Sequence, residues 1–360
     1  MNLTFILGNG FDINLGLKTS FQDFYEYYKE IECSTDSISE KRNFVEYVES
    51  IKSFDNWSDL EMTFGRHSVN VKTPIEYHQC QKDIEVELTK YIQKEYLNFP
   101  ILTEELDLSL FGELFERILS TLKPVDIRTL KNAPLSGRLK CAFLTLNYTN
   151  SLEEILSQYQ PAEDELPIEV HHIHGKLADN DIVFGVDNLS QIENKDIFSE
   201  LPNHSVDFIK PERTGYLGLG EDSACESIIL ESNIIYIYGS SIGDTDNKWW
   251  SLVLERLVFA PQTFLIIDIY SSKVTDDSSL GDKKTLEVEY IEKVINKSLR
   301  DFSKNIQVKK EYDNPEFISH LTSRILITIN KNIFSPIKNI VEKPLEVPTE
   351  AEVLEFIGIQ

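Results

Sequence analysis

Short apolar runs, each ended by glycine or a polar residue, alternate along this chain with segments whose apolar residues recur at helical spacing. The apolar runs cover residues 3–7, 141–146, 169–173, 182–184, 234–238, 263–269 and 305–308. Nearly continuous apolar runs of this length are typical of parallel strands buried on both faces. Strands separated by helices therefore predict an α/β fold with a mostly parallel, Rossmann-like sheet.

Helical periodicity dominates the long stretch between the first and second apolar runs. Phe21, Phe24, Tyr25 and Tyr28 share one face of a helix predicted over residues 19–32. Further helices are predicted around residues 44–51, 57–64, 75–97, 108–122, 151–158, 247–259, 286–299 and 315–326. We therefore expect three parts: a nucleotide-binding domain, a helical insertion and a tail rich in Pro and Glu. They are residues 1–18 with 138–330, residues 19–137, and residues 331–360.

Charge and cysteine content narrow the class of protein. Thirty-five Lys and Arg stand against 60 Asp and Glu, a formal net charge of −25, so no broad nucleic-acid surface is expected. Cys33, Cys80, Cys141 and Cys225 are far apart, as in a reduced cytoplasmic protein without structural zinc. No apolar run approaches the roughly 20 residues of a membrane span, and no basic leader precedes the first run. A cytoplasmic protein without membrane partners is expected.

The first run ends in a glycine-rich loop that includes Gly8, Asn9, Gly10, Phe11 and Asp12. Glycine lets the backbone approach an anionic ligand closely, so the loop is a candidate cradle for the phosphates or ribose of a dinucleotide. The fingerprint GxGxxG is absent because the third glycine falls at position 16, which argues against a dehydrogenase. The alternative is a tight turn that binds no ligand.

Two later strands also end in residues suited to chemistry. Asn147 follows the second run, and its amide can hold a ribose hydroxyl or a water; Asn or Thr there can also cap the next helix. His174 precedes a glycine at the end of the third run, which suits a general base, although a core histidine fits the same pattern. His172 shares its strand face, but no third ligand with metal-binding spacing follows, so no metal is expected.

The run over residues 234–238 ends in Gly239 and Ser240, which can bind phosphate or ribose through N–H and hydroxyl groups. Asp244 is a further candidate for binding the nucleotide, whereas Asp246 is expected to cap the next helix. In the helical insertion, Glu61 can reach the site from above or can be a solvated residue of an amphipathic helix.

The ordered motifs resemble the AbiH family of bacterial phage abortive-infection proteins. The motifs are GNGFD with LGLKTSF, then WSDLE, LNYTNSLEE, HIHG and YGSSIGDTD, over roughly residues 3–250. No single motif is specific, but the set in this order is. The resemblance implies an antiphage effector, with a phage protein as trigger and a homo-oligomer or a partner protein as its assembly.

The same order is similar to a remote sirtuin-like NAD-binding fold. The similarity implies that Asn147 and His174 are catalytic and that Gly239 and Ser240 form the ribose turn. It also implies a nucleotide loop, which would be residues Gly8, Asn9, Gly10, Phe11, Asp12 and Thr19. The loop departs from the sirtuin pattern, and the zinc-binding cysteine quartet is missing, so protein deacylation is not expected. Defence proteins with such domains often destroy NAD.

The resulting hypothesis is hydrolysis of the nicotinamide–ribose bond of NAD. Asn147 would hold the attacking water, His174 would take its proton, and Asp12 would stabilise positive charge developing on the ribose. One alternative is a module that binds NAD or another nucleotide as a signal and acts through a partner or assembly. Another is a metal-dependent nuclease, for which Asp244 and Asp246 are the only nearby acidic pair.

Overall fold

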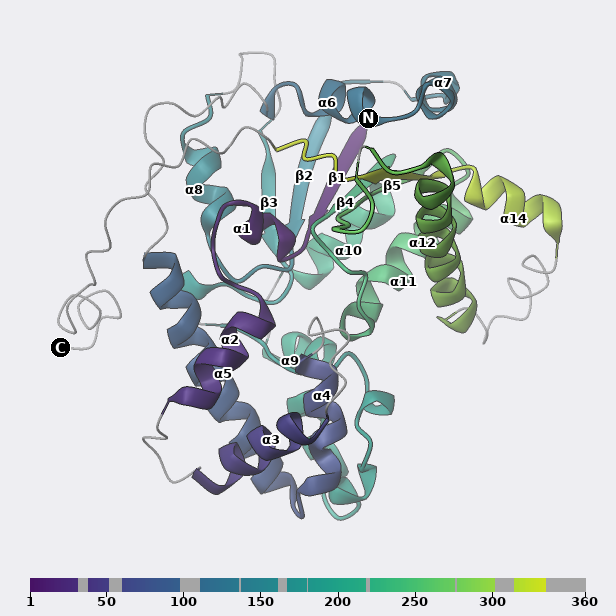
Figure 1. Cartoon of the computed structure of the whole chain (residues 1–360). Coiled ribbons are helices and arrows are strands. Elements are labelled where there is room, and N and C mark those ends of the chain that lie inside the picture. The colour runs from purple at the N-terminus through teal and green to yellow at the C-terminus, as the bar shows by residue number, and fades with distance from the viewer. Residues whose placement is uncertain are drawn as a thin grey trace.

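The fold is seen in a computed structural model of the chain (Figure 1). The structure describes residues 1–31, 38–51, 60–97, 111–135, 137–160, 167–179, 181–217, 221–275, 277–301 and 314–334. Three features predicted from the sequence lie outside these ranges: the strand at residues 305–308, the tail beyond residue 334 and residues 57–59 of the WSDLE motif.

Six parallel strands form one sheet in the order β3-β2-β1-β4-β5-β6 (Figure 1). They are β1 (Asn2–Leu7), β2 (Lys140–Thr145), β3 (Glu169–His172), β4 (Ile234–Tyr238), β5 (Phe264–Ile269) and β6 (Ile325–Ile329). This confirms the predicted α/β class. The strand order reverses between β1 and β4, and ligands of such sheets bind outside the carboxyl ends of the strands at that point.

Successive side chains of a strand point to opposite faces of the sheet, and helices bury both faces. Phe5 stacks on Phe143 in a core with α6 (Leu114–Thr121) and α8 (Ser151–Ser157). Ile6 belongs to the opposite core, under α10 (Asp222–Glu231), α11 (Asn247–Phe259), α12 (Leu280–Asp301) and α14 (Pro315–Thr322). Because helices cover both faces of the sheet, the strands are nearly continuous apolar runs in the sequence.

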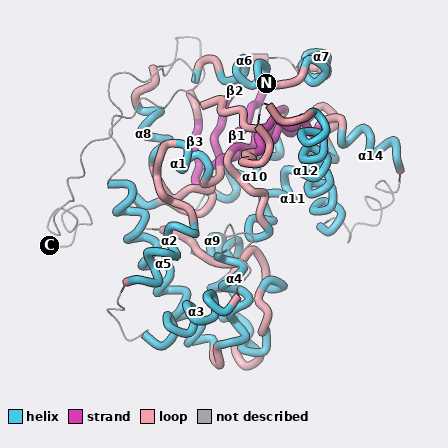
Figure 2. The backbone as a smooth tube through the Cα atoms, in the orientation of Figure 1, coloured by secondary structure: helices cyan, strands magenta, loops and turns pink. Residues whose placement is uncertain are grey.

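A third core lies off the carboxyl ends of the strands, among α2 (Phe21–Glu30), α3 (Ile38–Ser50), α4 (Leu60–His67) and α5 (Pro74–Leu97). Residues 177–179 and 181–209 contribute side chains to the same core; Phe184 contacts Phe64, which stacks on Tyr77 with ring centroids 4.4 Å apart. We call α2–α5 and residues 177–217 the helical lobe. Figure 2 shows the strands gathered in one part and the lobe made of helices and loops.

The insertion is divided between two cores. α6 and α7 (Pro124–Asn132) contribute Ile118 and Leu130 to the sheet core, not to the lobe. The domain boundaries expected from the sequence stay predictions, but the lobe's core also draws on residues that follow β3. The remaining elements are α1 (Gly10–Asn14), η2 (Ser68–Asn70), η4 (Leu177–Asp179), η5 (Leu189–Gln191), η6 (Lys195–Phe198), η7 (Pro202–Phe208), α9 (Lys210–Leu217) and η8 (Asp244–Asp246).

Two predicted elements are wrong. Residues 182–184 form no strand; the chain makes only an isolated bridge nearby, between Val186 and Ile209. The helix predicted over residues 315–326 ends at Thr322, and β6 begins at Ile325. Arg324 lies between the two elements, where its Nη1 shares its hydrogens among three carbonyl oxygens, the nearest being that of Leu257 at 2.7 Å. Within the described residues, no helix is both long and apolar enough to cross a membrane.

Candidate functional site

The glycine loops after β1 and β4 meet at the point where the strand order reverses. Gly8 donates to the carbonyl of Tyr238, and Gly10 donates to that of Gly239, both at 2.9 Å. A Cβ on Gly8 would lie 2.6 Å from the Gly239 oxygen, and Gly239 itself has φ +67°. Contact between the loops is therefore sufficient to require glycine at these positions.

Other members of the glycine loop serve its own structure. Asn9 Nδ2 donates to the Thr19 carbonyl at 2.9 Å, and the Thr19 hydroxyl donates to Asn9 Oδ1 at 2.5 Å. This pair closes the loop that leads to α2. The Phe11 side chain is fully buried against Phe334, with ring centroids 5.3 Å apart, so only its backbone can face a ligand.

Asp12 joins α1 to the turn between β2 and α8. Its two carboxylate oxygens accept hydrogen bonds from the hydroxyls of Thr149 and Ser151, each at 2.7 Å. Burial raises the pKa of Asp12 to about 6, and the hydroxyl hydrogen bonds limit that rise. Asp12 therefore holds α1 against the turn that leads to α8, and when ionised it places a buried negative charge at this edge of the sheet.

Asn147 lies at the carboxyl end of β2, beside Asp12. Asn147 is 6% exposed, and its Nδ2 makes no well-formed hydrogen bond with any described residue, although its side chain interacts with Asp12 and lowers the pKa of that carboxyl. His172 fixes the backbone here: Nδ1 lies 3.0 Å from the Asn147 carbonyl and Nε2 lies 2.7 Å from Glu153 Oε1. Burial lowers the pKa of His172, but the hydrogen bond and charge of Glu153 outweigh burial and raise it overall. A charged His172 then donates to both partners.

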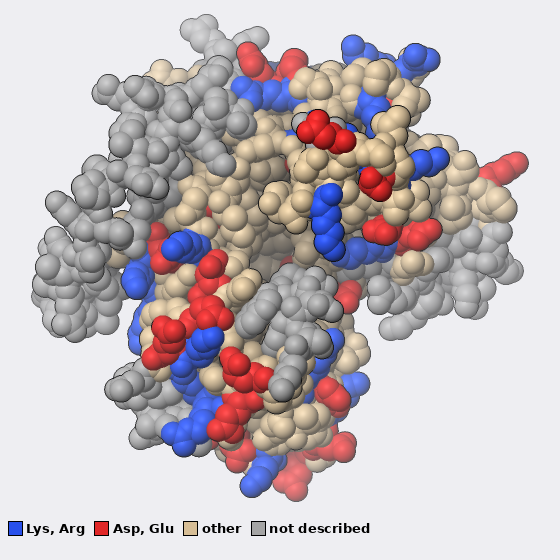
Figure 3. All heavy atoms as spheres, in the orientation of Figure 1, with Lys and Arg blue, Asp and Glu red and all other residues tan. Residues whose placement is uncertain are grey.

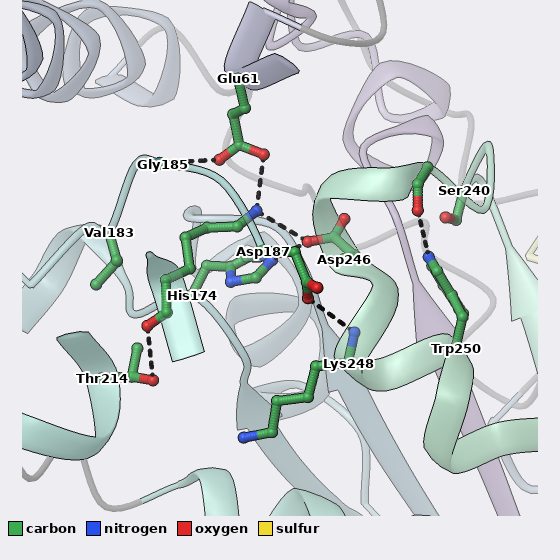
Figure 4. Close-up of polar contacts among 12 residues, drawn as sticks. Glu61, His174, Val183, Gly185, Asp187, Thr214, Ser240, Asp246, Lys248 and Trp250 are labelled. Carbon is green, nitrogen blue, oxygen red and sulfur yellow. Dashed lines mark hydrogen bonds and ion pairs between the residues drawn. The ribbon is translucent and has the colours of Figure 1, made fainter. Parts of the chain in front are cut away.

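His174 belongs to a chain of buried ionisable groups that reaches the helical lobe (Figure 4). Its Nε2 lies 2.7 Å from Asp246 Oδ1, and Lys210 Nζ lies 2.9 Å from the same oxygen. Lys210 Nζ also donates to Glu61 Oε2 at 2.7 Å, and Glu61 Oε1 accepts the Gly185 N–H at 3.4 Å. The four side chains come from the loop after β3, η8, α9 and α4.

The charges in this chain follow from its geometry. Burial opposes ionisation of Asp246, but Lys210 and His174 hold its pKa well below the usual range. Burial lowers the pKa of His174, as does the charge of Lys210. Burial also raises the pKa of Glu61, against the attraction of Lys210. The arrangement favours a neutral His174 whose hydrogen lies on Nε2, facing an ionised Asp246.

A small polar pocket adjoins His174. Its volume is about 10 Å³, which is the space of about one water molecule. Its polar lining includes His174, Asp187, Lys210, Thr214, Asp222, Thr245, Asp246 and Lys248. The lysines are neutralised by carboxylates, because Lys248 pairs with Asp222 at 2.6 Å while Lys210 pairs as above. The pocket is suited to a water or a hydroxyl group, not to a phosphate.

The structure brings the predicted glycines into contact, but among the described residues no hydrogen bond joins Asn147 to His174, and Asn147 does not line the pocket beside His174. Gly8, Gly10 and Gly239 meet at the centre of the sheet, and the Ser240 Oγ accepts the Ile242 N–H at 3.2 Å. The Asp244 carbonyl accepts from Gln191 Nε2 at 2.8 Å, which ties η8 to the lobe.

The prediction that Asp246 caps the next helix was wrong, and Lys210 was not among the predicted site residues. Asp246 stands at the N-cap position of α11 but makes no capping hydrogen bond, because its carboxylate is taken by His174 and Lys210. Lys210 carries no motif, and it lies 149 residues from Glu61, so no pattern could have paired them. Glu61 is 3% exposed, so it reaches the site and is not a solvated residue.

The described residues contain no group of three or more His, Cys, Asp or Glu side chains placed to hold a metal ion. On the face drawn in Figure 3, Lys and Arg side chains are interspersed with Asp and Glu over the lobe. That mixture is unlike the basic groove of a nucleic-acid enzyme.

A family model described as "Bacteriophage abortive infection AbiH" matches residues 4–268. The matched residues include the carboxyl ends of β1, β2, β3 and β4. No curated protein matches the chain.

Proposed function

Because the chain belongs to the bacteriophage abortive infection AbiH family, whose role is antiphage defence, we propose that it is a nucleotide-dependent effector. In this proposal it binds NAD at the carboxyl edge of the sheet, near Gly8, Gly10 and Gly239. It then hydrolyses the bond between nicotinamide and ribose.

The proposal rests on the buried amide of Asn147, whose Nδ2 has no well-formed hydrogen bond among the described residues. A buried donor without a partner costs about 1–3 kcal/mol, so such a group needs a reason to be kept. Asn147 Nδ2 lies at the edge where α/β sheets bind nucleotides, on a backbone that His172 holds in place. A ribose hydroxyl or the attacking water supplies the missing acceptor.

The reaction would use groups already described. Water attacks the ribose carbon that bears nicotinamide, a carbon–oxygen bond forms, and the carbon–nitrogen bond breaks with its electron pair leaving on nicotinamide. Since nicotinamide is cationic in NAD, it leaves neutral and needs no general acid. His174 takes the water proton on Nδ1. Asn147 orients the water or a ribose hydroxyl, and ionised Asp12 favours positive charge on the ribose.

The test is nicotinamide release from NAD by purified protein, with and without lysate of phage-infected cells. Asn147→Ala and His174→Ala are expected to lower the rate by roughly 10²–10⁴-fold, the usual contribution of an acid–base group. His204→Ala, an exposed histidine of η7, is the matched control and should keep the wild-type rate. No release by wild type in either condition, or equal release by all variants, would overturn hydrolysis.

A second candidate is nucleotide sensing without turnover. It is favoured by Asp12, because both carboxylate oxygens are engaged by Thr149 and Ser151 and neither is free to contact a substrate. Calorimetric titration with NAD and with ADP-ribose distinguishes the two. Binding of NAD that is recovered intact supports sensing, whereas recovery of ADP-ribose and nicotinamide supports hydrolysis.

A further inference from the structure

Four ionisable side chains meet where burial is expensive for each of them. Lys210 is 3% exposed and Glu61 4% exposed in their side chains, and Asp246 and His174 are also largely buried. Removing such ions from water costs several kcal/mol each, so a buried ion pair is weak support for a purely stabilising role. Lys210 alone balances two carboxylates, which makes it the centre of the group.

The hydrogen bonds determine which nitrogen of His174 is available. An ionised carboxylate only accepts, so the hydrogen of a neutral His174 must lie on Nε2, opposite Asp246 Oδ1. Nδ1 makes no hydrogen bond with any described residue and therefore presents its lone pair. Lys210 Nζ binds the same oxygen as His174, which fixes the rotation of the Asp246 carboxylate. Glu61 in turn anchors Lys210 from α4.

We propose that Asp246, Lys210 and Glu61 are positioning residues that hold His174 with Nδ1 free to take a proton, so that the helical lobe completes the site. The catalytic consequence rests on the proposed hydrolysis. The placement of His174 does not depend on the proposed hydrolysis, and it can be measured without NAD. Figure 4 shows the route: Glu61 descends from α4 toward the group that contains Asp246 and His174.

The other charged groups around His174 are mostly acidic. Lys248 is paired with Asp222 and Glu226, and its backbone N–H donates to Asp187 at 2.8 Å. The Asp222 charge favours a protonated His174, as does Asp246, whereas burial and Lys210 oppose it. Substitution of Lys210 therefore changes the charge that faces His174 while these neighbouring carboxylates stay in place.

The experiment is nitrogen-15 NMR of the histidine rings in the full chain, titrated with pH. Wild type is expected to show His174 with hydrogen on Nε2. Lys210→Met should raise the pKa of His174 because a nearby positive charge is lost. Glu61→Gln should shift the His174 nitrogen signals because it removes the carboxylate that anchors Lys210 Nζ beside Asp246. If hydrolysis is the function, Glu61→Gln should also lower kcat by about 10²-fold with little change in KM, as expected of a displaced catalytic group.

Glu85→Gln is the matched control. Glu85 joins α5 to Arg213 of α9, with Arg213 Nη2 donating to Oε2 at 3.1 Å, so like Glu61 it forms an ion pair with α9 inside the lobe, but it does not contact His174. It should leave the His174 signals and kcat unchanged. A folded Glu61→Gln protein with wild-type His174 signals would overturn the inference, as would equal shifts in Glu85→Gln.

A second variant covers the case in which Glu61→Gln does not fold. The double variant Glu61→Gln with Lys210→Met replaces the ion pair by neutral groups of similar size. It should raise the pKa of His174, and an unchanged pKa would refute positioning by Lys210. If the His174 signals move as stated but no protein releases nicotinamide, only the proposed hydrolysis fails.

Discussion

Gly10 donates its N–H to the carbonyl oxygen of Gly239, 2.9 Å away, and thereby joins the loops that follow the two central strands. This bond spans 229 positions of sequence. It places the glycine loop against the β4 turn as a backbone contact with no space for side chains. Whatever ligand binds here meets a preformed double loop.

Gly10→Ala should therefore destabilise the protein. The new Cβ would lie 2.5 Å from Gly239 Cα, and overpacking of this kind costs about 1–3 kcal/mol in free energy of unfolding. Gly215→Ala in α9 is the control, since its Cβ meets no atom within 4 Å, and it should stabilise the protein by up to about 1 kcal/mol. Urea unfolding measures both, and equal stability of Gly10→Ala and wild type would contradict the contact.

Asp12→Asn should gain stability over wild type as the pH rises from about 4 to above 6. The pKa of Asp12 is about 6 in the folded chain against 3.8 ordinarily, so ionising it in place costs the fold up to about 3 kcal/mol above pH 6 and nothing below pH 4. Asp12→Ala removes the acceptors of Thr149 and Ser151 and should be less stable than Asp12→Asn at both pH values. Urea unfolding at pH 4 and pH 7.5 compares the three proteins; a pH-independent difference between wild type and Asp12→Asn would contradict the raised pKa.

Glu153→Gln should destabilise the protein below neutral pH more than above it. The pKa of His172 is raised in the fold by Glu153, so the extra stability is complete below about pH 6.5 and is lost as the pH rises through the folded value. The expected loss at pH 6 is about 1–2 kcal/mol, in the range of a hydrogen bond between charged groups. Glu154→Gln, on the neighbouring exposed residue, should lack this pH dependence, and thermal unfolding at pH 6 and pH 9 tests the difference.

Lys210→Met should be among the most destabilising single changes, at about 3–5 kcal/mol, because it leaves two buried carboxylates without their cation. Adding Glu61→Gln should recover part of that loss. A double-mutant cycle on unfolding free energies measures the coupling between the two residues. Additive effects would mean that the 2.7 Å contact contributes no interaction energy.

The sheet was largely predictable because buried parallel strands leave a local signal. Residues 234–238 match β4 at both ends, since the run begins and ends with the strand. β6 was missed because the apolar residues of α14 continue into it without a glycine or proline, while Arg324, between the two elements, contacts carbonyl groups some 60 residues earlier. Local pattern cannot reveal such contacts with a distant segment.

The candidate site was predictable only where a strand end marks it. Asn147 and His174 each follow an apolar run, and the parallel topology places both at the same edge. Lys210 follows a series of short 3₁₀ helices, where hydrophobic periodicity is weak, and its partners come from α4 and η8. Asp246 occupies a position typical of a helix cap, so its sequence context pointed to the commoner use of that position.

The core of the helical lobe is formed by two segments that the ribosome synthesises at different times. Phe24 and Phe64 precede Phe208 and Ile209 by well over a hundred residues, yet all four pack together. At ~5–20 residues per second, synthesis separates Phe24 from Ile209 by roughly 10–40 s. β4 is synthesised later still, so the nascent chain lacks both the contact between Gly10 and Gly239 and the buried group around Lys210. If the chain hydrolyses NAD as proposed, the order of synthesis would keep the unfinished chain inactive.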